Sequence, residues 1–112
     1  MAIPNNTRQV SANAVAALGN WVSVHHGEGA GLTGANEAEG SERRQTSWSP
    51  TGTGVNLGST VNVPVGPGRY TEGGIWSSQS GGTFVGSDPF AGGDIIVSGG
   101  GASIDVTPTI SA

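Results

Sequence analysis

Two adjacent histidines and a nearby carboxylate form the cluster whose residue types are best suited to binding a metal ion or moving a proton. His25, His26 and Glu28 lie close together in the chain, and imidazole and carboxylate groups are common zinc ligands and proton carriers. Successive side chains of a β-strand point to opposite faces, so both histidines reach one ion only where the strand bulges. We therefore expect a strand end with one packed and one solvated histidine, and no metal site.

The remaining carboxylates give weaker signals. Glu37, Glu39 and Glu42 resemble the paired acids of a glycosidase, but those acids need a rigid separation across a cleft, and these three lie in a glycine-rich stretch. We expect a solvated acidic loop there. Asp88 and Asp94 flank the sequence PFAGG without the D-x-D-x-D-G spacing of a calcium loop, so no calcium site is expected.

Nucleophile and phosphate-binding motifs are also missing from the sequence. No G-x-S-x-G turn marks a nucleophilic serine beside a base. The glycine clusters at 27–31 and 99–101 do not fit the G-x-x-x-x-G-K-[ST] pattern, and the chain contains no lysine. We expect neither catalytic residues nor a cofactor, and an enzyme is the least favoured class.

Composition limits the class of protein further. The chain has 112 residues with 21 glycines and 6 prolines, and apolar residues recur between them in short clusters, as expected for one domain (1–112) of short strands and tight turns. Its net charge of −4 disfavours a nucleic-acid partner. Cysteine is absent, and no apolar stretch is long enough to span a bilayer. We expect a soluble protein without a membrane partner or an export signal.

One helix is expected, at residues 5–18. Val10, Ala14, Ala17 and Leu18 recur at helical spacing and give a narrow apolar face. Because alanine is small, this face is suited to close packing against a sheet or against another subunit.

Short strands and turns fill the rest of the chain. A strand at 21–25 places Val22 and Val24 on one face, a surface loop covers 27–40, and a strand near 44–48 precedes a turn at 49–54. The run Val61, Val63, Val65 alternates, and Pro64 within it indicates an edge strand.

The C-terminal half reads as two further hairpins. Residues 70–76 and 83–85 flank a Ser/Gly turn at 77–82, and strands at 94–97 and 103–107 are joined by glycines. Strand-sized runs at this spacing are typical of a mainly β fold, a small antiparallel sandwich or barrel with one short N-terminal helix.

The tryptophans are the remaining candidates for a binding surface. Aromatic side chains on a β surface form carbohydrate platforms or protein-binding anchors. The chain has few aromatic residues, so we expect at least two of Trp21, Trp48 and Trp76 to fill the core, and a carbohydrate-binding sandwich stays as an alternative.

Several longer stretches carry a resemblance. The segments MAIPNNTRQV, LGNWVSVHHGEG, LTGANEAEG, VNVPVG and YTEGGIWSSQSGGTFVG resemble a family of short virion proteins of actinobacterial tailed phages, described as minor capsid (head decoration), minor tail or tail-fibre proteins. The resemblance covers nearly the whole chain. It supplies no catalytic or binding positions that match residues here.

The resemblance implies a structural role in the virion. The expected function is a minor capsid protein on the outer surface of the phage head that stabilises the shell, with a minor tail or tail-fibre component as the alternative. Its expected partners are the major capsid protein and sister copies, with a homo-oligomer as one option. The expected contact residues are Val10, Ala14, Leu18, Trp21, Leu32 and Asn36.

Overall fold

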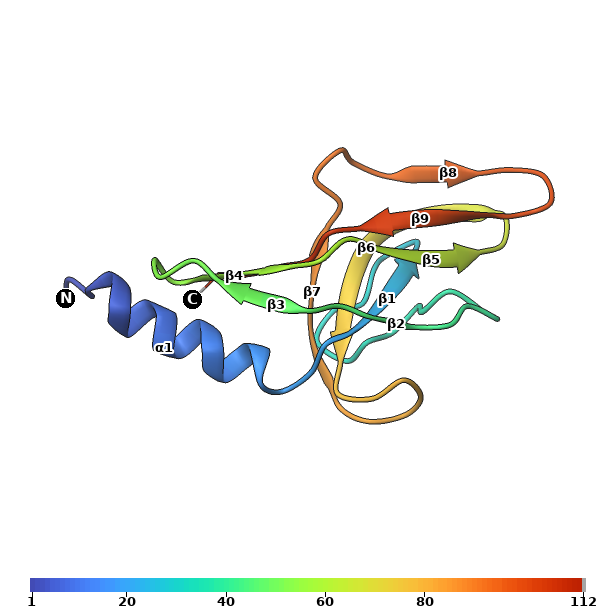
Figure 1. The fold of residues 1–112 in the computed structure, drawn as a ribbon. Coiled ribbons are helices and arrows are strands. Elements are labelled where there is room, and N and C mark those ends of the chain that lie inside the picture. Colours follow the sequence, from blue (N-terminus) through green and yellow to red (C-terminus); the bar gives the residue numbers. More distant parts are fainter. Residues whose placement is uncertain (112) are drawn as a thin grey trace.

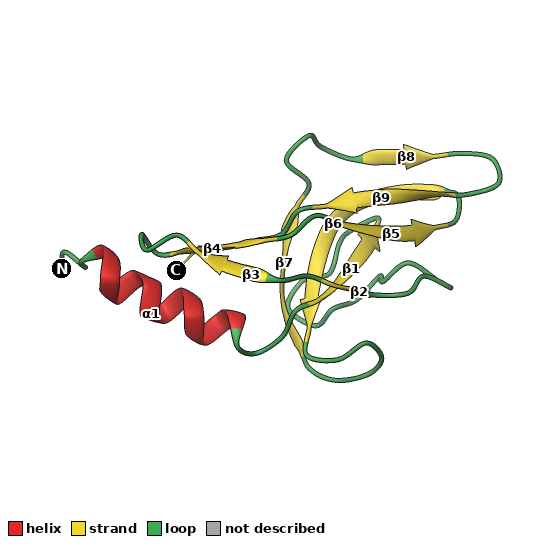
Figure 2. Cartoon of the chain, in the orientation of Figure 1, coloured by secondary structure: helices red, strands yellow, loops and turns green. Residues whose placement is uncertain are grey.

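The protein is mainly β, with one N-terminal helix, as expected from the sequence (Figures 1 and 2). A computed structural model describes residues 1–111. The elements are α1 (Asn5–Ala16), β1 (Trp21–His26), β2 (Arg44–Gln45), β3 (Trp48–Pro50), β4 (Val55–Gly58), β5 (Val61–Val65), β6 (Gly68–Trp76), β7 (Phe84–Pro89), β8 (Ile95–Val97), β9 (Ala102–Val106) and β10 (Thr109–Ser111).

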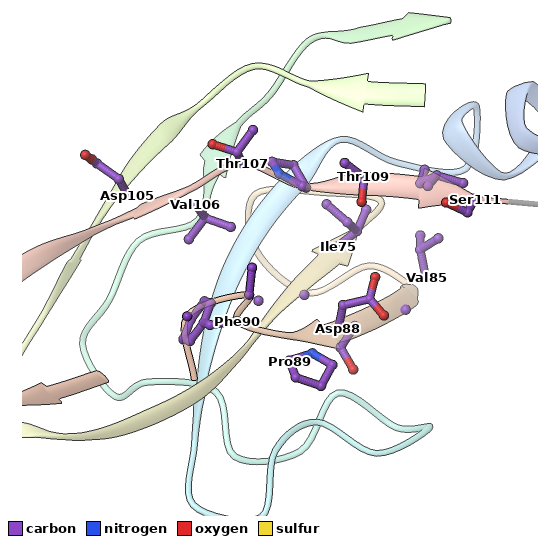
Figure 3. Close-up of a pocket in the computed structure, with 18 of the residues that line it drawn as sticks. Ile75, Val85, Asp88, Pro89, Phe90, Asp105, Val106, Thr107, Thr109 and Ser111 are labelled. Atoms are coloured by element: carbon purple, nitrogen blue, oxygen red, sulfur yellow. The ribbon is translucent and has the colours of Figure 1, made fainter. Parts of the chain in front are cut away.

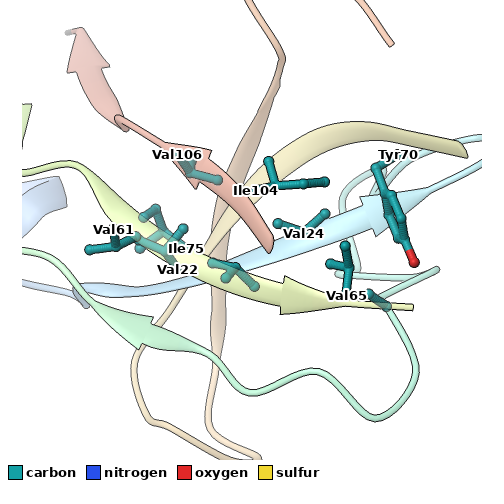
Figure 4. Close-up of a cluster of buried hydrophobic side chains, with 10 residues drawn as sticks. Val22, Val24, Val61, Val65, Tyr70, Ile75, Ile104 and Val106 are labelled. Carbon is teal, nitrogen blue, oxygen red and sulfur yellow. The ribbon is translucent and has the colours of Figure 1, made fainter. Parts of the chain in front are cut away.

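The hydrophobic core lies between two antiparallel sheets. One has five strands in the order β2-β1-β6-β7, with β8 also paired to β6, and the other is the pair β5-β9. Figure 4 shows side chains of β1, β5, β6 and β9 converging between them. The buried members are Val22, Val24, Ala38, Val61, Val63, Val65, Tyr70, Ile75, Ile104 and Val106. Burying each valine or isoleucine side chain contributes about 1.5–3 kcal/mol.

A second part of the chain extends away from this core. Helix α1 packs on the three-stranded sheet β10-β4-β3, and we call these four elements the arm. The molecule measures 48 × 28 × 23 Å, and the arm accounts for its elongation (Figure 1).

Polar contacts hold the helix on the arm. The Gln9 side-chain oxygen accepts hydrogen bonds from the backbone N–H groups of Gly52 and Gly54, at 2.8 and 3.1 Å. The side-chain oxygen of Asn13 accepts a hydrogen bond of 2.9 Å from the Asn56 amide. Between these two residues, Ala12 is fully buried. The helix therefore meets its sheet through a small polar face.

The predicted apolar face of the helix points the other way. Val10 is 68% exposed and Leu18 is 60% exposed, and Ala14 and Ala17 are exposed as well. The helix also ends at Ala16 rather than at residue 18. Of the two expected partners for this face, the sheet is wrong and another subunit stays a prediction. Gln9 and Asn13 turn a different side of the helix to the sheet, because they accept hydrogen bonds from Gly52, Gly54 and Asn56.

Two strand predictions are confirmed. Strands β6 and β7 form the predicted hairpin around the 77–82 turn. Within residues 1–111, strand β5 pairs with β9 alone, which makes it the edge strand that Pro64 indicated. Its side chains alternate between buried valines and the more exposed Asn62 and Pro64.

The prediction of a C-terminal hairpin is wrong. Strand β8 pairs with β6 and strand β9 pairs with β5, so the glycine-rich segment between them crosses from one sheet to the other. The predicted strand at 44–48 is interrupted, since β2 and β3 belong to different sheets, and β10 was not predicted. Local alternation indicates that a segment is extended, but it does not identify the strand with which it pairs.

Candidate functional site

A buried hydrogen-bond network connects β1 and β6. The His25 Nε2 atom lies 2.6 Å from the Ser23 hydroxyl, which accepts a 3.0 Å hydrogen bond from the Trp76 indole N–H. The His25 Nδ1 atom lies 2.8 Å from the carbonyl oxygen of Ala35. Because a carbonyl only accepts, Nδ1 carries the ring proton, and Nε2 accepts from Ser23.

This serine and histidine resemble a nucleophile and its base, but the structure closes the pair off. Ser23 is 1% exposed and His25 is fully buried. A side-chain carbon added at Gly74 would lie 2.6 Å from both polar atoms, so no space for a substrate exists beside them. The network therefore serves packing and specificity within the sheet.

Burial lowers the pKa of His25 below its usual 6.5, against the opposing effects of the Ala35 hydrogen bond and the negative Glu37 and Glu72. In the unfolded chain this histidine takes up its proton near pH 6.5, whereas in the folded protein it does so only at a lower pH. The unfolded state therefore binds more protons in that interval. Protonation would also leave the Ser23 hydroxyl hydrogen without its acceptor.

We expect the free energy of unfolding to fall as the pH drops below 6.5, by up to about 1.4 kcal/mol per pH unit. Urea unfolding at a series of pH values from about 7.5 to 5.5 measures this slope. Replacing His25 with glutamine should remove its part of the slope. A wild-type stability that does not change across this interval would contradict the assignment.

The two histidines lie in different environments, one packed as predicted and the other half-buried rather than solvated. His25 is buried and His26 is partly exposed, and the strand has an irregularity between them. Both ring nitrogens of His25 are engaged within the protein. Among residues 1–111, no group of three or more histidine or acidic side chains is arranged to hold a metal ion.

The acidic loop is more ordered than a solvated loop. Glu37 is partly buried and forms a two-pronged ion pair with Arg43, with both N···O distances 2.9 Å. Arg43 also donates to the carbonyls of Ser78 and Gly81 and lies 3.8 Å above the Trp76 ring. The expectation of a solvated loop is wrong for Glu37, because Arg43 draws this carboxylate against the sheet. Glu39 and Glu42 are exposed, as predicted.

None of the three tryptophans is fully buried. Trp48 packs against the core, and its indole N–H donates to the Gly19 carbonyl at 3.0 Å. Trp76 packs against Phe84 with ring centroids 5.1 Å apart and is covered by Arg43. Trp21 is half-buried at the start of β1. The rings of Trp48 and Trp76 thus serve packing, although neither reaches the degree of burial expected from the sequence.

The six predicted contact residues lie in two regions. Val10 and Ala14 lie on the exposed side of α1, Leu18 follows its end, and half-buried Trp21 begins β1. Leu32, at 99% exposure, and Asn36 lie in the 27–40 loop. Asn36 has a positive φ of 60° and donates to the Gly29 carbonyl, so its side chain helps to shape the loop.

A groove of about 870 Å³ was not predicted from the sequence (Figure 3). One wall is formed by β7 and the residues after it up to Gly92, and the other by the segment from Asp105 to Ser111. We call it the β7–β10 groove. Its lining includes the apolar side chains Val15, Ile75, Val85, Phe90, Val106 and Ile110. Because these come from distant segments, no local pattern indicates that they share a surface.

Comparisons with known proteins give no relative. No protein-family model, no curated protein and no solved structure matches this chain. Within residues 1–111, α1 falls short of the length and apolar character needed to cross a bilayer.

Proposed function

We propose that this protein is a structural component of a phage virion, a minor capsid (decoration) protein that binds the outer surface of the shell and stabilises it. The observation that carries this proposal is the orientation of helix α1 on its sheet. The side with the buried Gln9 and Ala12 packs inward, and the side with Val10, which is 68% exposed, faces outward.

The outward side of the helix has the properties of a docking surface. Val10 and Ala14 lie on one exposed side of the helix, and the exposed Leu18 follows its end. A set of neighbouring exposed apolar residues, unlike a single one, marks interaction sites. The small alanine allows a partner's backbone or side chains to approach closely. Leu32, at 99% exposure, offers a second apolar contact on the 27–40 loop.

Other properties agree with an assembly role. The Ser23–His25 pair is inaccessible, and the sequence resembles short virion proteins of actinobacterial phages. Each copy would then have two apolar contacts, one on the helix and one at Leu32. One contact could bind the shell while the other binds a sister copy. Many weak contacts repeated over a shell act together, so small interfaces are sufficient.

The copy number in purified particles tests the virion role. We expect the protein to remain with separated heads at a fixed, high ratio to the major capsid protein, measured by quantitative mass spectrometry. Recovery with tails at a few copies per particle would instead favour the minor tail or tail-fibre role. Absence from both fractions would contradict a virion role altogether.

A helix substitution tests the docking surface. We expect Val10→Asp to reduce occupancy on particles that lack the protein by about tenfold, equivalent to about 1.4 kcal/mol, because a charge replaces an apolar contact. Its free energy of unfolding should change by no more than about 0.5 kcal/mol, since Val10 is exposed. Ser80→Asp, at an exposed position in the 77–82 turn, is the matched control. Equal occupancy of both variants would exclude the helix as the contact.

A further inference from the structure

The β7–β10 groove is bordered by outer strands of two different sheets. Strand β7 pairs with β6 and strand β10 pairs with β4, and neither has a second strand partner among residues 1–111. Each strand thus keeps one edge whose backbone N–H and C=O groups are available for pairing, and such edges accept an added strand. With residues 84–89, β7 is the longer edge, so the groove geometry fits an extended segment.

The groove floor is a margin of the hydrophobic core where half-buried Val85 and Phe90 lie beside buried residues. Ile75, Val85 and Phe90 line it beside Val106 of the opposite sheet (Figure 3). Gly86 lies opposite Ile75 in the β6–β7 register, so a side chain at position 86 would be on the same face as Ile75. A carbon atom added there meets no atom within 4 Å. This space can hold alternate side chains of an incoming strand.

The charge of the groove is negative. Among the described residues, Asp88 and Asp105 are the charged ones that line it. Asp88 is exposed and forms no ion pair or side-chain hydrogen bond within residues 1–111, whereas Asp105 accepts a hydrogen bond from Asn62. Carboxylates beside an apolar surface favour a partner that carries basic side chains.

We propose that the β7–β10 groove binds an extended segment of a partner protein that adds to β7 as a further strand and carries an apolar and a basic residue two positions apart, because Gly86 and Asp88 share one face of β7. Its backbone would pair with the free edge of β7, as in other strand-addition complexes. Its apolar side chains would fill the space beside Gly86, and its basic side chains would lie against Asp88. This interaction goes beyond the virion role, because it assigns a specific peptide chemistry to one groove.

Binding of a labelled peptide tests this site. The probe is fluorescein-Thr-Val-Thr-Arg-Thr-Val-Thr, whose valines and arginine share one face of a strand, titrated with the full chain by fluorescence anisotropy at low salt. We expect saturable binding that is about tenfold tighter than that of the same peptide with glutamate in place of arginine. A peptide with N-methylated central residues should bind at least about tenfold more weakly, because it cannot donate to the β7 edge.

Variants of the groove make the test specific. Asp88→Asn should weaken binding of the arginine peptide about tenfold, and Gly86→Val should abolish binding by filling the floor. Asp94→Asn, outside the groove and paired with Arg69, should leave affinity unchanged. Both groove variants remove no internal contact, so circular dichroism should show a folded protein.

Several results would overturn the proposal. These are the absence of saturable binding, equal affinity for the arginine and glutamate peptides, or unchanged binding by Gly86→Val. Sedimentation of the free protein, which measures its oligomeric state, can give a further contradicting result. If the wild type self-associates and Gly86→Val is monomeric, a second copy occupies the groove, and the proposed partner segment is wrong.

Discussion

Replacing Arg43 with alanine is expected to lower the free energy of unfolding by about 3 kcal/mol. The guanidinium group is buried and joins three parts of the chain: Glu37 in the acidic loop, the carbonyls of Ser78 and Gly81 in the 77–82 turn, and the Trp76 ring. Its removal leaves a partly buried carboxylate and two carbonyls without their donor. Urea unfolding measures the loss.

The neighbouring arginine supplies a matched control. Arg44 forms an ion pair of 2.8 Å with Glu42, but both side chains are exposed, so Arg44→Ala should cost no more than about 0.5 kcal/mol. Arg43→Lys should recover only part of the stability, because an ammonium group cannot form the two-pronged pair. Equal losses for Arg43→Ala and Arg44→Ala would contradict the role assigned to Arg43.

Adding a methyl group at Gly74 is expected to lower the free energy of unfolding by about 3 kcal/mol. In Gly74→Ala the new carbon would lie 2.6 Å from His25 Nε2 and from Ser23 Oγ, so these atoms must separate. The separation breaks the buried hydrogen bond and disturbs the Trp76 indole, which donates to the same hydroxyl. Thermal and urea unfolding, together with a change in tryptophan fluorescence, would report the effect.

Gly86→Ala, on the adjacent strand, is expected to raise the free energy of unfolding instead of lowering it. An added carbon at Gly86 meets nothing within 4 Å, and the backbone is not in the left-handed region. Alanine then stabilises by up to about 1 kcal/mol, because the unfolded chain has fewer conformations to lose. If Gly74→Ala and Gly86→Ala lowered the free energy of unfolding by similar amounts, the loss at Gly74 could not be assigned to the His25 network.

The two histidine-linked predictions report on the same network in different ways. Acid acts on the His25 ring, which burial keeps neutral, whereas Gly74→Ala acts on the space around it. If both are correct, Gly74→Ala should also reduce the pH dependence of stability. The altered ring would then be more accessible to water, and its pKa would move back toward that of the unfolded chain.

The sequence by itself determined the fold class and most of the extended segments. Alternating Val61, Val63 and Val65 produce a strand with one buried face, and the Ser/Gly turn at 77–82 connects β6 to β7. Ser23 and His25 could be placed on one face from their spacing alone. These features follow from local geometry, since the two-residue period of a strand and the preferences of turn residues do not depend on distant parts of the chain.

Only the tertiary structure decided which strands pair and which way the helix faces. The glycine-rich segment before β9 allows either a hairpin or a crossing between sheets, and the free edge of β5 decides in favour of the crossing. The helix orientation depends on the N–H groups of Gly52 and Gly54, which lie far along the chain and need Gln9 as acceptor. The β7–β10 groove has the same origin, because its walls come from segments that meet only when the sheets have formed.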